Sequence, residues 1–140
     1  MLTLFVALTT LAACTVGRWY LERPSRKDRS YAKGRIELCT CYNPGAGFGL
    51  RTSRAVVTAA SAVTLLSLWL RRRRAPVGVG LLLGGGVSNL FERMRFKKVF
   101  DYVCFPKAPG QLRKYVFNLA DFAIFAGGLY LLLKKKRRNT

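Results

Sequence analysis

The chain has 140 residues, of which 51% are hydrophobic and 22% are charged, and its formal net charge is +19. The two classes occupy separate blocks of sequence, which is typical of a membrane protein and argues against an ordinary soluble domain. The basic excess alone would suit a nucleic-acid-binding protein. However, the basic residues gather where apolar blocks end, and no nucleic-acid-binding motif accompanies them. We therefore expect contacts with membrane lipids and none with nucleic acid.

Four apolar blocks predict four membrane-spanning helices. They cover approximately residues 2–20, 55–70, 76–92 and 115–133. Since a span needs roughly 17–25 residues, the second and third blocks depend on flanking residues, tilt or a locally thinned bilayer. The expected fold class is an all-α membrane protein whose single domain covers residues 1–140.

The first block, "MLTLFVALTTLAAC", has two interpretations. It could be a cleavable signal, with "LAAC" as a lipobox and Cys14 as the acylated residue. No Lys or Arg precedes the apolar run, so the basic region expected of a signal peptide is missing. We favour a retained span that ends near Trp19 and Tyr20, which suit a membrane interface.

Residues 21–54 form the longest polar segment, and we expect them to make a small cradle outside the membrane. Apolar and polar residues alternate from Ile36 to Tyr42, which predicts a short strand. The "NPGAGFG" loop follows at residues 43–49, where glycines permit positive φ and a close backbone approach. Such a loop suits a binding surface.

The cysteines leave more than one pairing open. Cys39 and Cys41 would point to the same face of an extended strand, and Cys104 lies in the other loop on the same side. Cys104 could pair with either of them in an oxidising compartment, and unpaired cysteines fit the sequence equally well. We expect no metal site and no cofactor, because the chain contains no His and Cys14 belongs to a span.

Charge alone does not decide the orientation in the membrane. "RRRR" (71–74) and "KKKRR" (134–138) follow the second and fourth blocks, so they share one side. Placing these dense clusters in the cytoplasm also puts both termini there. The other basic residues then fall mostly on the outer side, which opposes this orientation.

The third block ends in polar residues and leads to a pair of carboxylates. Asn89 and Arg93 are four residues apart and share a helical face. Beyond them lies Asp101, within "VFDYVCF", and Asp121 lies about two turns inside the fourth apolar block. Antiparallel helices joined at this end would bring the two carboxylates together.

Two adjacent carboxyl groups in a poorly solvated site cannot both ionise easily, so one keeps a proton. Such a pair provides an acid and a base around one water molecule, which can then attack a peptide carbonyl. Without His, the usual Ser–His and Cys–His systems are excluded. Taken singly, Asp101 could instead be a solvated residue paired with Lys97 or Lys98. Asp121 could be a carboxylate favoured at a helix N-terminus.

Four motifs carry a family resemblance. "NPGAGFG" (43–49), "GGGVSNLFER" (84–93), "VFDYV" (99–103) and "FNLAD" (117–121) occur in this order. They resemble N-x-G-x-x-F-G, G-G-x-x-G-N-L-x-D-R, V-x-D-F and F-N-x-A-D, the successive motifs of bacterial lipoprotein signal peptidase, also called signal peptidase II.

The resemblance implies an aspartic endopeptidase of the bacterial cytoplasmic membrane, monomeric, with its site at the outer face and both termini in the cytoplasm. It would cleave prolipoproteins N-terminal to a diacylglyceryl-modified cysteine. Asp101 and Asp121 would be the catalytic pair. The residues that cradle or orient the substrate would be Asn43, Gly45, Asn89, Arg93 and Asn118.

This sequence departs from the family pattern at several positions. Ser88 replaces a Gly, Glu92 replaces an Asp, and the first span lacks the family's Asp followed by Lys. A polar contact would then be missing, with altered substrate preference or lost activity as the result. A non-enzymatic scaffold or a transport subunit is the second interpretation, but the polar residues collect at one end of the spans, which favours the peptidase.

Overall fold

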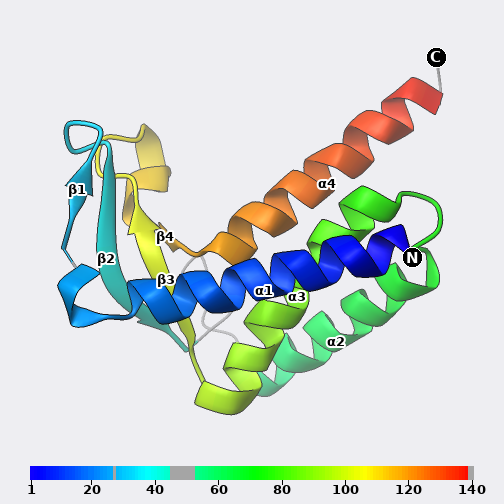
Figure 1. Ribbon diagram of the computed structural model, residues 1–140, viewed down its shortest axis with the longest axis horizontal. Coiled ribbons are helices and arrows are strands. Elements are labelled where there is room, and N and C mark those ends of the chain that lie inside the picture. The colour runs from blue at the N-terminus through cyan, green and yellow to red at the C-terminus, as the bar shows by residue number, and fades with distance from the viewer. Residues whose placement is uncertain (27, 45–52, 139–140) are drawn as a thin grey trace.

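The computed structural model describes residues 1–26, 28–44 and 53–138, which form a helical bundle with a small sheet at one end. The helices are α1 (Leu2–Leu21), α2 (Arg54–Leu70), α3 (Pro76–Phe96) and α4 (Leu119–Arg138). The strands are β1 (Ser30–Tyr31), β2 (Ile36–Asn43), β3 (Val99–Cys104) and β4 (Val116–Phe117). The N-terminus and the far end of α4 both lie at the end away from the sheet (Figure 1).

Helix α3 is the centre of the bundle and contacts the other three helices. Two adjacent glycines allow this close packing. A Cβ added at Gly84 would lie 2.6 Å from the carbonyl oxygen of Ala7 in α1, and one at Gly85 would lie 2.6 Å from that of Ala120 in α4. Glycine is therefore needed at both positions for helix backbones to approach α3 from two sides.

The helices differ in how well they meet the criteria for a membrane span. Among the described helices, α1 alone is both long and apolar enough, and α2 is apolar but shorter. Large apolar side chains nevertheless point outward from several helices. Examples are Val63 in α2 and Phe125 in α4, which are 66% and 74% exposed. The fold is thus mostly helical, as expected, with one clear candidate span.

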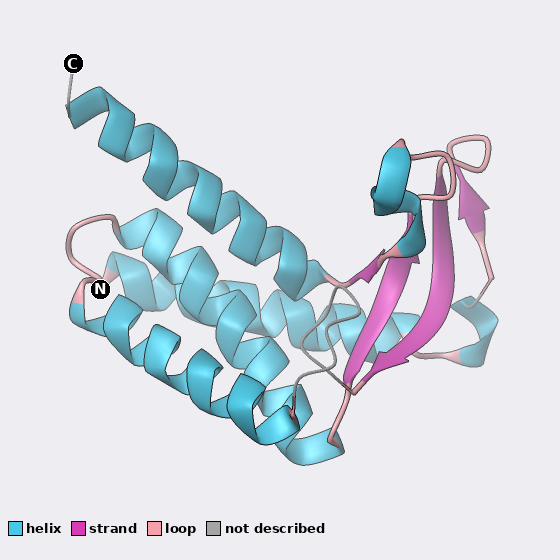
Figure 2. Cartoon of the chain, turned by 180° about the vertical axis from the view of Figure 1, so that it is seen from behind, coloured by secondary structure: helices cyan, strands magenta, loops and turns pink. Residues whose placement is uncertain are grey.

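The sheet is antiparallel, and its strands lie in the order β1-β2-β3-β4. The strand expected from Ile36 to Tyr42 is confirmed as β2. Its pairing with β3 changes register between Leu38 and Cys41, so a bulge interrupts the ladder there. Beyond the bulge, Cys41 lies opposite Asp101. Figure 2 shows the sheet beyond one end of the helices, with the short 3-10 helix Gly110–Lys114 beside it.

The sheet is larger than the cradle expected from residues 21–54. Strand β3 lies in the segment that the sequence suggested was a loop around Asp101, and β4 occupies the start of the fourth apolar block. Helix α4 consequently begins at Leu119 and not at residue 115. Helix α3 extends past residue 92 to Phe96 and ends at Lys97, which adopts a left-handed conformation with φ 61°.

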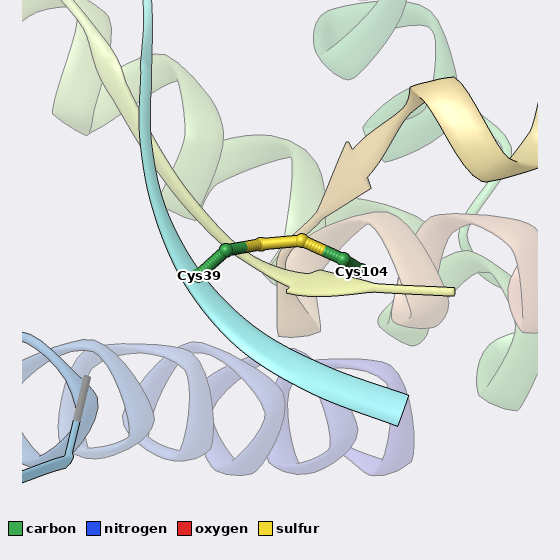
Figure 3. The surroundings of a disulfide bond; sticks show 2 residues. All are labelled: Cys39 and Cys104. Atoms are coloured by element: carbon green, nitrogen blue, oxygen red, sulfur yellow. A yellow bond between two sulfur atoms is a disulfide. The ribbon is translucent and has the colours of Figure 1, made fainter. Parts of the chain in front are cut away.

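A disulfide bond joins Cys39 in β2 to Cys104 in β3 (Figure 3). This resolves the pairing that the sequence left open, while Cys14 and Cys41 are free thiols. The bond lies next to the β-bulge and fixes the two central strands covalently.

Candidate active site

The two carboxylates predicted from the motifs meet around Asn118, which directly precedes α4. The Asn118 side-chain amide donates to Asp101 Oδ1 at 2.7 Å. Its backbone N–H donates to Asp121 Oδ2 at 3.0 Å. Asp101 comes from the middle of β3 and Asp121 from the first turn of α4. One residue therefore contacts both acidic groups.

The start of α4 explains why a carboxylate lies inside an apolar segment. Asn118 Oδ1 accepts the backbone N–H of Asp121 at 3.0 Å, while the Asp121 carboxylate accepts the backbone N–H of Asn118. This reciprocal pair is a capping box, which satisfies two backbone donors at the helix start. The partial positive charge of the helix N-terminus also favours an anion there.

Helix α3 contributes Asn89 and Arg93 to the same cluster. Asn89 Nδ2 donates to Asp121 Oδ1 at 3.0 Å, and its side-chain oxygen accepts from Asn118 Nδ2 at 3.1 Å. Arg93 Nη1 donates to the Asn89 carbonyl oxygen at 3.3 Å, which fits the shared face expected from their spacing. Arg93 Nε is buried, and it has no hydrogen-bond partner among the residues that the structure describes.

The sheet adds Asn43 at the end of β2, where its Nδ2 donates to Asp101 Oδ2 at 3.4 Å. Gly45, the other residue expected in the cradle loop, lies outside the described residues. Asp101 therefore accepts hydrogen bonds from the amides of Asn43 and Asn118. The alternative of a solvated Asp101 paired with Lys97 or Lys98 is wrong, because Asp101 is only 5% exposed and takes part in neither ion pair found among the described residues.

The environment of Asp101 raises its pKa from 3.8 to about 6. Burial is the main cause, because removal from water disfavours the charged form, and the negative charge of Asp121 adds to the effect. The hydrogen bonds from Asn118 and Asn43 act in the opposite direction. A carboxyl group with this pKa can hold or release a proton near neutral pH.

A cavity of about 610 Å³ opens onto both carboxylates. Asn43, Asn89, Arg93 and Asn118 belong to its lining, so all described members of the predicted site reach one space. The rest of the lining is mainly apolar and includes an aromatic cluster, in which the ring centres are 6.0–6.2 Å apart. The members of this cluster are Phe105, Phe117 and Phe122. The site therefore combines a polar, acidic wall with an apolar one.

Sequence reasoning missed a buried ion pair beside the site. Arg18 Nη1 of α1 lies 2.9 Å from Glu92 Oε2 of α3. The same Glu92 oxygen accepts the backbone N–H of Phe100 at 2.9 Å. We expected a polar contact of the first span to be missing, but Arg18 does connect α1 to this region. The only signal in the sequence was a basic residue at the end of the first apolar block.

A family model described as Signal peptidase (SPase) II matches residues 5–136, nearly the whole chain. The chain belongs to the signal peptidase II family. The resemblance of the four motifs is thereby confirmed at the level of the family. The two acidic motifs supply Asp101 and Asp121, and both carboxylates face the cavity described above.

The names of similar proteins agree with this family assignment. The chain is 38% identical over 109 residues to the "Lipoprotein signal peptidase" of Nitrobacter hamburgensis, covering 69% of this chain and 66% of that protein. It is 36% identical over 111 residues to the protein of the same name from Methylorubrum extorquens, covering 72% and 64%. The chain thus spans about two thirds of the length of these two relatives.

Solved structures support the fold of the family member. A protein described as a bacterial membrane enzyme, solved by the in meso method at 2.3 Å resolution, superposes with a TM-score of 0.86. The alignment covers 99% of this chain and 89% of that one at 15% identity. A second, solved at 1.9 Å resolution, gives a TM-score of 0.78 with 94% and 90% coverage, also at 15% identity. At this identity the likeness concerns the fold.

Proposed function

We propose that this chain is an aspartic endopeptidase that removes the signal peptide from prolipoproteins, cleaving N-terminal to the diacylglyceryl-modified cysteine. The observation that carries the proposal is the contact of Asn118 with both Asp101 and Asp121 at an apolar cavity. Membership of the signal peptidase II family supports it, as do relatives that carry the name lipoprotein signal peptidase.

The two carboxyl groups share one proton and act on one water molecule. The ionised carboxylate takes a proton from the water as the water oxygen bonds to the scissile carbonyl carbon. The protonated carboxyl donates a hydrogen bond to the carbonyl oxygen, which gains negative charge. When the C–N bond breaks, the proton taken from the water passes to the leaving nitrogen, and the charge of the pair is restored.

The surroundings of the two carboxyl groups suit a shared proton. Asp121 accepts one hydrogen bond at each oxygen and lies in the first turn of α4, and both features favour its anion. Asp101 has a pKa raised to about 6 by burial and by the nearby Asp121 charge. The pair titrates as a unit, so its apparent pKa values belong to both residues together.

The polar groups around the pair orient the pair and the substrate in this proposal. Asn118 and Asn89 hold the carboxylates through hydrogen bonds, and Asn43 holds Asp101 from the sheet. Arg93 lines the cavity beside the pair, where its guanidinium can donate to a substrate carbonyl. Gly45 remains a prediction from the motif.

We further propose that α1 to α4 all cross the membrane as one domain over residues 1–140, with both termini in the cytoplasm. The location of both helical ends opposite the sheet supports this arrangement (Figure 1). The disulfide between Cys39 and Cys104 supports an outer, oxidising location for the sheet. A prolipoprotein anchored in the bilayer then meets the carboxylates at the outer interface, in a monomeric enzyme surrounded by lipid.

Replacement of either carboxylate tests the chemistry. Asp101→Asn and Asp121→Asn should each lower cleavage of a diacylglyceryl-modified prolipoprotein by about 1,000-fold or more, because the general acid–base pair is lost. Cleavage is followed by gel shift with purified protein in detergent, with circular dichroism as the control for folding. Cleavage at the wild-type rate by either folded variant would refute the mechanism.

Thiol labelling in intact cells tests the orientation. A membrane-impermeant maleimide should label Cys41 from outside, and Cys39 and Cys104 only after reduction, because the latter two are bonded to each other. The Cys41→Ser variant controls for labelling without reduction. Labelling that requires permeabilised cells would place the sheet in the cytoplasm and reverse the proposed orientation.

A further inference from the structure

The position of Asp101 depends on the backbone of the short strand that carries it. In a strand, neighbouring side chains point to opposite faces. Asp101 faces the cavity, whereas Phe100 and Tyr102 are buried with ring centres 5.4 Å apart. Both neighbours of Asp101 are also tied by hydrogen bonds to helices, one to α3 and the other to α4.

The first tie involves Glu92 and the residue before Asp101. The Phe100 backbone N–H donates to Glu92 Oε2 at 2.9 Å. Arg18 Nη1 lies 2.9 Å from the same oxygen, and the two side chains are only 15% and 9% exposed. The Arg18 guanidinium also lies 4.0 Å from the ring centre of Phe96. Since the carboxylate is buried, its ion pair and hydrogen bond are needed to offset the cost of leaving water.

The second tie involves Tyr102, the residue after Asp101. Its hydroxyl oxygen accepts the backbone N–H of Leu119 at 2.9 Å. Leu119 lies between Asn118 and Asp121, the two residues of the capping box. One hydrogen bond thus connects the two backbone segments that bear the carboxylates. The ring of Tyr102 is 5% exposed, and its pKa is raised to about 12 by burial, so the hydroxyl stays neutral.

We propose that Glu92 and Tyr102 are positioning residues, which hold the two sides of Asp101 against α3 and α4 and thereby fix its carboxyl group relative to Asp121. This inference rests on the peptidase function proposed above. Neither side chain is needed to contact the substrate. Their effect follows from geometry, because reacting groups displaced by about 1 Å can lose on the order of 100-fold in rate.

The test compares Tyr102→Phe with the matched control Tyr31→Phe. The first substitution removes only the hydroxyl oxygen that receives the Leu119 N–H, and the second changes an exposed tyrosine in β1. We expect kcat of Tyr102→Phe to fall about 10-fold with KM changed less than about 2-fold, since the lost bond orients the pair without binding substrate. Tyr31→Phe should match the wild type in both constants.

A pair of substitutions at Glu92 separates positioning from general loss of stability. Glu92→Gln keeps an oxygen that can accept the Phe100 N–H, whereas Glu92→Leu does not. If the hydrogen bond positions Asp101, kcat should decrease from the wild type to Glu92→Gln and again to Glu92→Leu. Equal kcat for folded Gln and Leu variants would overturn the role of Glu92. If Glu92→Leu does not fold, a kcat of Glu92→Gln below one tenth of the wild-type value would overturn the role of Glu92, because Gln keeps an acceptor for the Phe100 N–H.

Infrared titration of the Asp101 carboxyl band gives a readout that does not need activity. The band is identified by its loss in Asp101→Asn, and its midpoint in the wild type is one of the apparent pKa values of the pair. Tyr102→Phe should shift this midpoint, because Asp101 then changes its distance to Asp121. The inference fails if kcat and midpoint both equal those of the wild type. If the wild type has no peptidase activity, the proposed function is refuted. A shift of the midpoint in Tyr102→Phe would then still support the positioning role.

Discussion

The two ends of the helical bundle, which Figure 1 shows on opposite sides of the molecule, differ in their acidic residues. All six acidic residues fall within residues 22–37, 92–101 and 121, at the end with the sheet. The other end carries the basic residues 71–74 and 134–138. There, Arg72 Nη1 donates to the carbonyl oxygen of Trp69, and Lys134 Nζ donates to that of Arg74.

The difference lies in burial. At the sheet end, Asn89, Glu92, Asp101 and Asn118 are each at most 7% exposed, and they bond to one another or to buried backbone groups. A buried polar group without a partner costs roughly 1–3 kcal/mol, so each position there is restricted. Most of the cations at the basic end whose side chains the structure describes are exposed. The comparison teaches that burial, rather than the amount of charge, marks the end where specific chemistry is built.

The largest effect among the remaining predictions is expected at Asn118. Asn118→Ala removes the side-chain donor to Asp101 and the acceptor for the Asp121 N–H. Hydrogen bonds to charged groups contribute about 1.5–3 kcal/mol, so cleavage should fall by about 100-fold or more. Asn118→Asp keeps the oxygen that caps α4 and serves as the matched control for folding. Near-normal cleavage by Asn118→Ala would show that the sheet end tolerates the loss of these hydrogen bonds. The contrast between the two ends would then lose its support.

The disulfide should make the next largest contribution. Replacing Cys39 and Cys104 together by Ser should lower the free energy of unfolding by about 2–4 kcal/mol. Chemical unfolding in detergent measures this change, and a reductant should destabilise the wild type but not the variant. Cys41→Ser, which removes a free thiol of the same strand, is the control. Equal stability of all three proteins would show that the sheet end needs no covalent support.

A pH dependence of stability should follow from Asp101. Its pKa is higher in the folded protein than the ordinary 3.8, so the folded state binds more protons between about pH 4 and 6. The free energy of unfolding should therefore fall as the pH rises through this window. A rise from 3.8 to about 6 corresponds to no more than about 3 kcal/mol.

Asp101→Asn should remove this part of the dependence and should be more stable than the wild type above pH 6. Thermal unfolding in detergent between about pH 4 and 6 measures this dependence of stability on pH. Asp28→Asn, which changes an exposed carboxylate, is the control. Identical pH profiles for the wild type and Asp101→Asn would mean that the buried carboxyl group is not the source of the dependence.

The smallest effect is expected at the basic end. Arg73 is exposed, so Arg73→Gln should change the free energy of unfolding by less than about 0.5 kcal/mol. Cleavage should stay within about twofold of the wild type in the prolipoprotein assay. A loss as large as that of Asn118→Ala would show that the basic end takes part in the reaction, and the contrast between the two ends would no longer hold.

The sequence predicted the helices better than the sheet. Each of the four apolar blocks corresponds to a helix in the structure. A long apolar run can be recognised in the sequence even when the residues that it contacts are unknown. Strand β3 was missed because "VFDYVC" has no alternation of apolar and polar residues, being covered on both faces, and β4 has only two residues. Which cysteine pairs with Cys104 depends on a bulge in β2, and no local pattern reports it.

The candidate site was predicted mainly from motifs. Asn118 and Asp121 lie three residues apart, so their contact is local and could be foreseen from "NLAD". The Arg18–Glu92 pair joins α1 to α3, and it depends on how the two helices are rotated against each other. The bond between Tyr102 and Leu119 depends likewise on the path of the chain between β3 and α4. Such long-range contacts leave little trace in a single sequence.

The capping box links the reactivity of the site to the folding of the first turn of α4. The bonds that nucleate α4 are the same bonds that orient Asp121, so fraying of a single helical turn would dismantle the reaction centre while the remaining helices stayed packed. Deuterium uptake at the amides of Asn118 and Asp121 would then report, residue by residue, the fraction of molecules ready to react.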